Sequence, residues 1–473
     1  IWSPDSKWIA FTDHIQQLWV TEVASGKTTL VDKDAFLHPE RTINPVWSPD
    51  SKWIAYAKRL PSQFHTIMAY EMAKGKSIQL TDGMSNAHAP AWDASGKYLY
   101  FLASTNFALA SGWLDMTAIE RPSRRSVYMI VLKKGEPSPL LPESDEEKPE
   151  DKKPAADSGK VTVQIDLTGI SQRILSLDMP ERNYGELKAG ESGELFVSEY
   201  VPNQEGATLH KYSGKERKAE KFLSPVSFYT LSKDGKKLLY KSGASWGIVD
   251  AAGKPAIGDG ALSTGGIKIK IDPRKEWQQI FREGWRYQRD FLYVRNTHGA
   301  DWNKVYERYA PLVEHVAHRE DLNYLLDIIG GEVSIGHSFV GGGDIPRADP
   351  VRIGLLGADL EVSGRNYRIK KIYTGENWNP ALRAPLSAPG VDVNEGDFIL
   401  AVDGVAVNAG VNIYSLFENK ANKQVSIRVS KQADGSGART VIVVPVDSEQ
   451  GLRNFDWVES NRRKVDQLSN GKI

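Results

Sequence analysis

The segment Trp2–Phe11 (WSPDSKWIAF) is the clearest indication of the fold, because it recurs along the first half of the chain. A near-identical copy, WSPDSKWIAY, occupies residues 47–56, and a looser copy, WDASGKYLYF, occupies residues 92–101. Successive copies are 45 residues apart. A tight turn followed by an apolar strand, repeated every ~40 to 50 residues, is typical of the blades of a β-propeller. In each copy Pro-Asp-Ser or Ala-Ser-Gly forms the turn, and the apolar residues after it form a strand between neighbouring sheets.

Weaker copies at residues 191–197 and 233–240 extend the array, so we expect about five blades ending near Leu262. Between the third and fourth copies, residues 143–154 (ESDEEKPEDKKP) have almost nothing to bury, which predicts a solvated loop. Closed propellers usually have about four to eight blades, and we expect this ring to be incomplete at its N-terminal side. The repeats alone suit a scaffold or binding ring and name no activity.

Composition excludes several classes of protein. The 60 Lys+Arg and 60 Asp+Glu residues give a formal net charge of zero, which argues against a broad nucleic-acid or anionic-membrane surface. No apolar run approaches the ~20 residues of a membrane-spanning helix. The lack of cysteine excludes disulfides, a thiol nucleophile and cysteine-ligated metal. At 473 residues the chain is too long for one core, so about three domains are expected.

Helical periodicity replaces the repeats after residue 266. Asp272 can cap a first helix that begins at Pro273, a second helix is expected from Asp301, and a third ends at Gly330-Gly331. The apolar residues at helical spacing predict a small core. They are Trp277, Ile280, Phe281 and Trp285 in the first helix, Val305, Tyr309 and Leu312 in the second, and Leu322, Leu325, Leu326 and Ile329 in the third.

Two histidines in this region, His315 and His318, are three residues apart. Metal ligation needs a third ligand, and nothing nearby supplies one, so a solvated or capping role is favoured and no metal site is predicted. Six further histidines stand in no motif and receive no assignment.

His337 is the candidate catalytic residue. It lies in Gly330–Phe339 (GGEVSIGHSF), where helical periodicity stops and Val333 and Ile335 suggest a short extended piece. The glycines at 341–343 let the backbone turn sharply or approach a ligand closely. A neutral imidazole held here can take a proton from a serine and return it to a leaving amine. The alternative is a buried, hydrogen-bonded structural histidine.

From Val351 onward the pattern is one of short strands with glycine-flanked turns. Gly354-Leu355-Leu356-Gly357 leads into a strand, and GDFILAVDG follows at residues 396–404, an order that resembles a PDZ domain of bacterial proteases. Free N–H groups in the loop Gly354–Gly357 could hold a terminal carboxylate while the adjacent strand edge pairs with an extended peptide. The alternative is a spacer domain that binds no peptide.

The last residues predict an amphipathic helix over 456–466 and then a turn that enters a strand, as if the chain were cut inside its next domain. The fold class we expect is multidomain and mainly β: an incomplete propeller, a small helical domain and a PDZ-like α+β domain. The predicted domains are propeller blades over 1–262, a helical core domain with His337 over 263–350, a PDZ-like domain over 351–449 and the start of a further domain over 450–473.

Taken in order, these parts resemble the tricorn protease family over nearly the whole chain. Its most specific stretches here are 290–293 (DFLY), 298–302 (HGADW), Gly336-His337 and 375–380 (GENWNP). The resemblance implies a serine peptidase of short peptides, assembled as a hexamer, with His337 as general acid/base. It also implies that the serine nucleophile, the acidic partner and the oxyanion hole belong to a domain beyond Ile473. Some members place a serine just before the histidine, where this chain has Gly336.

The expected function is therefore a part of a peptidase, with this portion alone inactive, no cofactor, no nucleic-acid partner and no membrane span. A cytoplasmic location is expected, or a periplasmic one if a signal peptide lies upstream of Ile1. The alternative is a non-catalytic protein in which the propeller and the PDZ-like domain bind partners.

Overall fold

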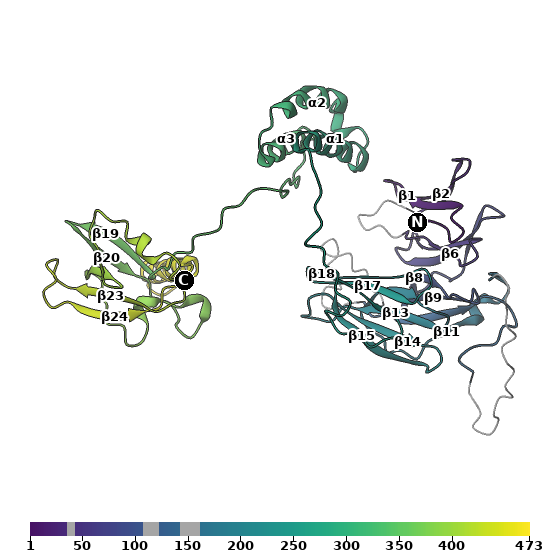
Figure 1. Cartoon of the computed structure of the whole chain (residues 1–473), viewed down its shortest axis with the longest axis horizontal. Helices are drawn as coiled ribbons and strands as arrows, with labels where there is room; N and C mark the ends of the chain where they lie inside the picture. Colours follow the sequence, from purple (N-terminus) through teal and green to yellow (C-terminus); the bar gives the residue numbers. More distant parts are fainter. Residues whose placement is uncertain (36–42, 107–122, 142–160) are drawn as a thin grey trace, which may run out of the picture. The chain divides into compact units, whose positions relative to one another are not determined.

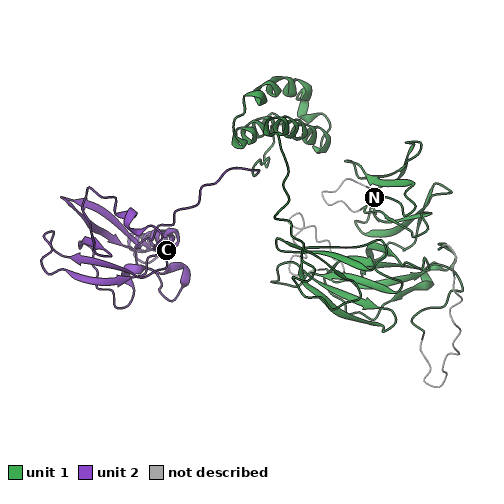
Figure 2. Ribbon diagram, in the orientation of Figure 1, with its two compact units in different colours: residues 1–342 green, residues 343–473 purple. Residues whose placement is uncertain are grey.

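The computed structural model describes residues 1–35, 43–106, 123–141 and 161–473 (Figure 1). The chain divides into two compact units, residues 1–342 and residues 343–473 (Figure 2). The segment 143–154, for which a solvated loop was predicted, lies outside the described residues.

Five antiparallel sheets of the first unit follow one another along the chain. Each joins strands that are consecutive in sequence, as propeller blades do. The strands are β1 (Trp8–Thr12), β2 (Gln17–Glu22) and β3 (Thr28–Lys33); β4 (Val46–Trp47), β5 (Trp53–Arg59), β6 (His65–Glu71) and β7 (Lys76–Gln79); β8 (Asn86–Trp92), β9 (Tyr98–Ser104), β10 (Ser126–Val131) and β11 (Ile174–Ser176); β12 (Tyr184–Ala189), β13 (Glu194–Glu199), β14 (Ala207–Ser213) and β15 (Lys218–Val226); and β16 (Phe228–Leu231), β17 (Lys237–Ser242) and β18 (Ser245–Asp250). The predicted mainly β fold with about five blades is confirmed.

The repeated sequence makes the same contacts in successive blades. The Ser3 hydroxyl donates to Asp5 at 2.6 Å and accepts the N–H of Trp8 at 3.0 Å, which closes the turn before β1. In the second blade the Ser48 hydroxyl donates to Asp50 at 2.7 Å and accepts the N–H of Trp53 at 2.9 Å. The indole of Trp47 donates to the carbonyl of residue 1, and that of Trp92 to the carbonyl of residue 46, so the second blade is joined to the first and the third to the second.

The propeller core lies between neighbouring sheets. Ala55 and Ile67 of the second blade are fully buried in one cluster with Ala87 and Leu99 of the third. Burial of such apolar surface stabilises the blades by about 25 cal/mol per Å². Lys233 in the fifth blade donates to the carbonyl of Pro4 in the first at 2.8 Å, so the first and last described blades also meet.

The helical part of the first unit contains α1 (Pro273–Phe291), η3 (Thr297–Gly299), α2 (Trp302–Tyr309), η4 (Ala310–His315) and α3 (Arg319–Gly331). Asp272 caps α1 by accepting the N–H of Lys275, as predicted. The second helix starts next to the expected position, and Asp301 caps it by accepting the N–H of Lys304. The predicted stripes meet in one core in which Phe281 and Leu322 are almost completely buried. Leu312 is the exception: it lies in η4 rather than in the second helix, and it is exposed.

The second unit is a five-strand path, β19-β20-β21-β23-β24, with β22 paired to β21. Its elements are β19 (Ala358–Ser363), β20 (Asn366–Ile372), η5 (Pro380–Leu382), η6 (Pro385–Ser387), β21 (Phe398–Val402), β22 (Val405–Ala406), η7 (Ile413–Phe417), β23 (Val425–Ser430), β24 (Arg439–Val443) and α4 (Gln450–Ser469). The helix predicted at 456–466 is longer than expected, and Asn470 ends it in a left-handed conformation.

Candidate functional site

The three helices that precede His337 form a rigid base. The indole of Trp285 on α1 donates to the carbonyl of Trp302 at 2.7 Å, and the indole of Trp302 returns a hydrogen bond to the carbonyl of Trp285 at 2.9 Å. This reciprocal pair joins α1 to the start of α2, and Ile329 of α3 is buried in the same core. The point at which α3 ends is therefore well fixed.

Beyond α3 the chain folds back on the helix end. Glu332 accepts hydrogen bonds from Arg308 at 3.0 Å and from the hydroxyl of Tyr309 at 2.5 Å, and Val333 is buried. A Cβ added at Gly330 would lie 2.6 Å from the hydroxyl of Ser338, so a larger residue there would require that hydroxyl to move. These contacts hold the residues on both sides of His337 against α3.

His337 itself is exposed and has a φ of 63°, in the left-handed region that histidine rarely adopts. The extended piece predicted here is wrong: residues 332–333 form a turn and Ser334 is also left-handed, with a φ of 57°. The ring of His337 tilts over Phe339 with centroids 6.2 Å apart. Within the described residues neither ring nitrogen has a hydrogen bond, so the imidazole is accessible but not oriented.

No hydroxyl of the described residues meets that ring. The hydroxyl of Ser338 lies over Gly330 instead. A Cβ added at Gly336 would meet nothing within 4 Å, so the position in front of the histidine has room for a larger side chain. His337 can accept a proton from a nucleophile that reaches it, but the described residues supply neither nucleophile nor orienting group.

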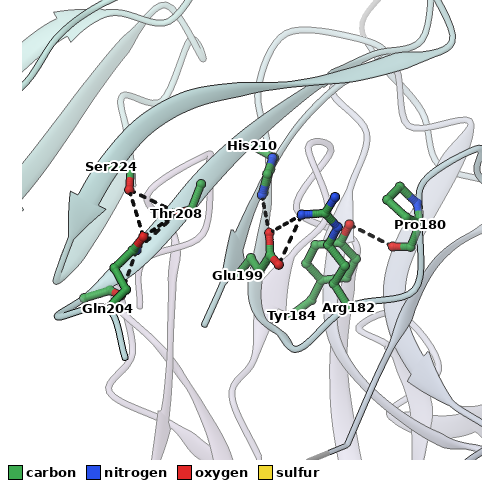
Figure 3. A network of polar contacts seen from close by, with 9 residues as sticks. Pro180, Arg182, Tyr184, Glu199, Gln204, Thr208, His210 and Ser224 are labelled. Carbon is green, nitrogen blue, oxygen red and sulfur yellow. Dashed lines mark hydrogen bonds and ion pairs between the residues drawn. The ribbon is translucent and has the colours of Figure 1, made fainter. Parts of the chain in front are cut away.

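The propeller contains a pairing of acid and base, on β13 and β14. Figure 3 shows Glu199 between His210, whose Nε2 lies 2.7 Å from a carboxylate oxygen, and Arg182, whose guanidinium donates at 2.9 Å. The nearby hydroxyl of Ser224 contacts Thr208 at 3.0 Å and belongs to a separate group. Because Arg182 and His210 share one carboxylate and no hydroxyl meets His210 among the described residues, this network is structural.

The other histidines singled out from the sequence have plain roles. His318 caps α3 by accepting the N–H of Glu320 through Nδ1 at 3.2 Å, as the capping interpretation predicted. His315 is exposed at the end of η4. Among the residues that the structure describes, no group of three or more His, Asp or Glu side chains is arranged to hold a metal ion.

The loop Gly354–Gly357 differs from its sequence interpretation. The N–H of Gly354 donates to the carbonyl of Phe417 at 2.9 Å, and the N–H of Leu355 donates to that of Val446 at 2.7 Å. A carboxylate-binding loop needs free N–H groups, and these two are already used within the chain.

The end of the loop is closed in another way. The N–H of Gly357 donates to a carboxylate oxygen of Glu449 at 2.7 Å, and Leu356 is buried in the core of the unit. Three of the four predicted donors are therefore occupied, and the expectation of an open loop is corrected. Sequence reasoning missed Glu449, whose only signal is its position four residues before Arg453 at the start of a helix.

The loop precedes an edge strand. Among the described residues β19 pairs with β20 alone, so its other edge offers backbone groups to an extended peptide. None of the helices that the structure describes has both the length and the apolar character to cross a bilayer.

Three family models match successive parts of the chain. Residues 1–252 match the second beta propeller domain of tricorn protease, residues 273–331 its C1 domain and residues 354–448 its PDZ domain. His337 lies between the second and third matched ranges.

Curated relatives agree with these matches. The chain is 28% identical to a tricorn protease homolog of Saccharolobus solfataricus, covering 100% of this chain and 43% of the relative. It is 30% identical to tricorn protease homolog 1 of Streptomyces coelicolor, covering 82% of this chain and 38% of the relative. The chain thus spans less than half of the length of either protein.

A solved structure shows the same fold. The crystal structure of the tricorn protease superposes with a TM-score of 0.78 at 23% identity, covering 100% of this chain and 46% of that one. Because the propeller model alone matches residues 1–252, more than half of the 473 residues, the chain belongs to the tricorn protease family.

Proposed function

We propose that this chain is part of a serine peptidase that hydrolyses short peptides, with His337 as its general acid/base. The observation that carries the proposal is an accessible imidazole on the fixed end of a helical core, in a chain of the tricorn protease family. The base would take the proton of an attacking serine and return it to the leaving amine.

In this proposal the serine belongs to a part of the protein that the sequence does not contain. The relatives are more than twice as long as their matched portions, which leaves room for it. The free ring nitrogens of His337 are consistent with a histidine whose orienting groups come from elsewhere. Peptide capture by the PDZ region and hexameric assembly are parts of the same proposal, as is a cytoplasmic location.

The test compares His337→Ala with His315→Ala in the full-length gene product, on fluorogenic peptides. Both residues are exposed histidines of the helical region, so the pair controls for loss of an imidazole from that surface. We expect kcat/KM to fall at least ~10³-fold for His337→Ala, because members of a catalytic triad act as a unit. His315→Ala should stay within about twofold of wild type.

Wild-type turnover by the His337 variant would contradict the assignment. Absence of peptidase activity in the wild-type protein would favour a binding protein built from propeller and PDZ surfaces.

A further inference from the structure

The carboxylate of Glu449 fills the end of the glycine loop in the second unit. One oxygen accepts the N–H of Gly357 at 2.7 Å. The other accepts two hydrogen bonds from the guanidinium of Arg453, at 2.6 and 3.0 Å. The Glu449 side chain is only 8% exposed. A backbone N–H and a guanidinium that converge on one carboxylate form a receptor for that chemical group.

Charged contacts extend the attachment of α4 to the sheet. Arg453 also donates to Asp359 on β19 and to the hydroxyl of Tyr373, each at 2.8 Å. Its guanidinium lies 4.6 Å from the centroid of the Tyr373 ring. Lys371 on β20 donates to Asp456 of the helix at 2.5 Å. The first two turns of α4 are thus bound through ionic and cation–π contacts.

Apolar burial adds little to this attachment. Leu452 is the one buried side chain of α4, and it packs with Tyr373 and Ala384. Farther along the helix Trp457 is 66% and Leu468 75% exposed. The charged contacts of Arg453 and Asp456 therefore hold the start of α4 on the sheet more than apolar burial does.

The closed end of the loop adjoins the strand edge that suits a peptide. Gly357 immediately precedes β19, which pairs only with β20 among the described residues. Tyr414 on η7 faces the same cluster: burial raises the pKa of its phenol, and the negative charge of Glu449 adds to the rise. Helix α4, η7 and the start of β19 therefore meet at one place.

We propose that Glu449 occupies the position of a peptide's terminal carboxylate, so that its side chain closes the loop and must swing away before a peptide C-terminus can bind, while Arg453 stays on the sheet through Asp359 and Tyr373. The receptor for that C-terminus is the N–H of Gly357 together with the guanidinium of Arg453. Its backbone would then add to β19 as an antiparallel or parallel strand. The inference rests on peptide capture by the PDZ region within the proposed function, and is independent of His337.

The experiment measures fluorescence anisotropy of a labelled alanine-rich hexapeptide ending in leucine, with a free or an amidated C-terminus, on the full chain. We expect Glu449→Ala to bind the free-carboxylate peptide at least about tenfold more tightly than wild type, which corresponds to a wild-type loop closed about 90% of the time. The amidated peptide should change less than about twofold. The double variant Glu449→Ala/Arg453→Ala should lose the gain.

Glu459→Ala is the matched control, because Glu459 also lies on α4 and pairs with Arg462 away from the loop. It should bind as wild type does. Equal affinity of Glu449→Ala and wild type would overturn the proposal, and so would an equal gain for the amidated peptide. No binding by any variant at millimolar peptide would overturn it as well.

Two further measurements guard against misfolding of the alanine variant. Glu449→Gln keeps the shape and an oxygen acceptor but loses the charge, so an intermediate gain is expected. In wild type, saturating free-carboxylate peptide should speed hydrogen exchange of the first turn of α4, residues 450–453, severalfold as Glu449 leaves the loop, while exchange in the rest of the helix stays unchanged. Peptide binding without that change would count against the closed-loop mechanism. A peptidase that loses activity in His337→Ala while Glu449→Ala gains no affinity would retain the proposed function and lose this inference.

Discussion

The two sites expected from the sequence are built in opposite ways. The segment around His337 is open: the imidazole is exposed and no hydrogen bond holds either ring nitrogen within the described residues. The loop Gly354–Gly357 is closed: three of its N–H groups donate to the carbonyls of residues 417 and 446 and to Glu449. His337 needs a further group to orient its imidazole before it can act as a base. The loop needs its own Glu449 carboxylate to leave before it can bind another one.

The difference concerns what each kind of site needs from its surroundings. A general base works when other groups fix its tautomer and direction, so an exposed imidazole has accessibility without orientation. A carboxylate receptor works when its donors are vacant, and buried donors do not stay vacant because an unsatisfied N–H costs about 1–3 kcal/mol. The loop therefore recruits a carboxylate from its own chain.

The largest expected difference in stability is between two glycine-to-alanine variants, one in the closed loop and one beside His337. In Gly357→Ala the new Cβ would lie 3.0 Å from Pro385 and 3.3 Å from Leu452, on a backbone with φ of 70°. We expect a loss of about 2–4 kcal/mol in the local unfolding free energy of β19 and β20. In Gly336→Ala nothing lies within 4 Å, and a change of no more than about 0.5–1 kcal/mol is expected.

Hydrogen exchange of β19 and β20 and of the His337 segment measures the local unfolding free energy in each variant. Equal losses at the two glycines would show that the His337 segment is as tightly enclosed as the loop, and the comparison would fail.

The fold was predictable because its determinants are local. The Ser-Pro-Asp turn makes its hydrogen bonds within five residues, and the same contacts recur 45 residues later, so a repeat in sequence becomes a repeat in structure. The caps Asp272 and Asp301 act three residues away. Short-range chemistry of this kind is visible in one sequence.

Whether each site is open or closed could not be predicted, because that depends on contacts between residues far apart in the sequence. Whether the loop is open depends on Glu449, which is 92 residues from Gly357. The left-handed backbone of His337 follows from the fold of the chain back onto α3, where Ser338 lies over Gly330. Both outcomes depend on tertiary contacts that override local preference.

An enclosed histidine in the propeller provides the contrast to the exposed His337. The Nε2 atom of His88 on β8 is buried; burial lowers the pKa of the ring to about 3, and the charge of Arg125 adds to this. The unfolded chain takes up this proton below pH 6.5 while the folded one does not, so propeller stability is full above pH 6.5 and falls as the pH drops toward 3.

In acid the expected loss is about 1.4 kcal/mol per pH unit from this group. Denaturant titrations at pH 5.5 and 4.5 measure it, and His88→Leu should reduce the slope by about that amount. An unchanged slope in the variant would mean that the ring charges without cost, and that the site is open to water.

The smallest effect is expected at the base of the open segment. Glu332 receives Arg308 and Tyr309 just before the turn that leads to His337. Glu332→Ala should cost about 0.5–1 kcal/mol in stability, because one partner is largely exposed. In the full-length protein it should lower kcat about two- to fivefold with KM unchanged, since the imidazole would be presented less uniformly.

Glu307→Ala, at an exposed position on α2, is the control and should leave both constants within about twofold. Steady-state kinetics on the same fluorogenic peptides separates the outcomes. A loss close to that of His337→Ala would mean that the anchor at Glu332, rather than groups from elsewhere, orients the imidazole. The segment would then be a site already built by its own helices, and the distinction between an open and a closed site would no longer hold.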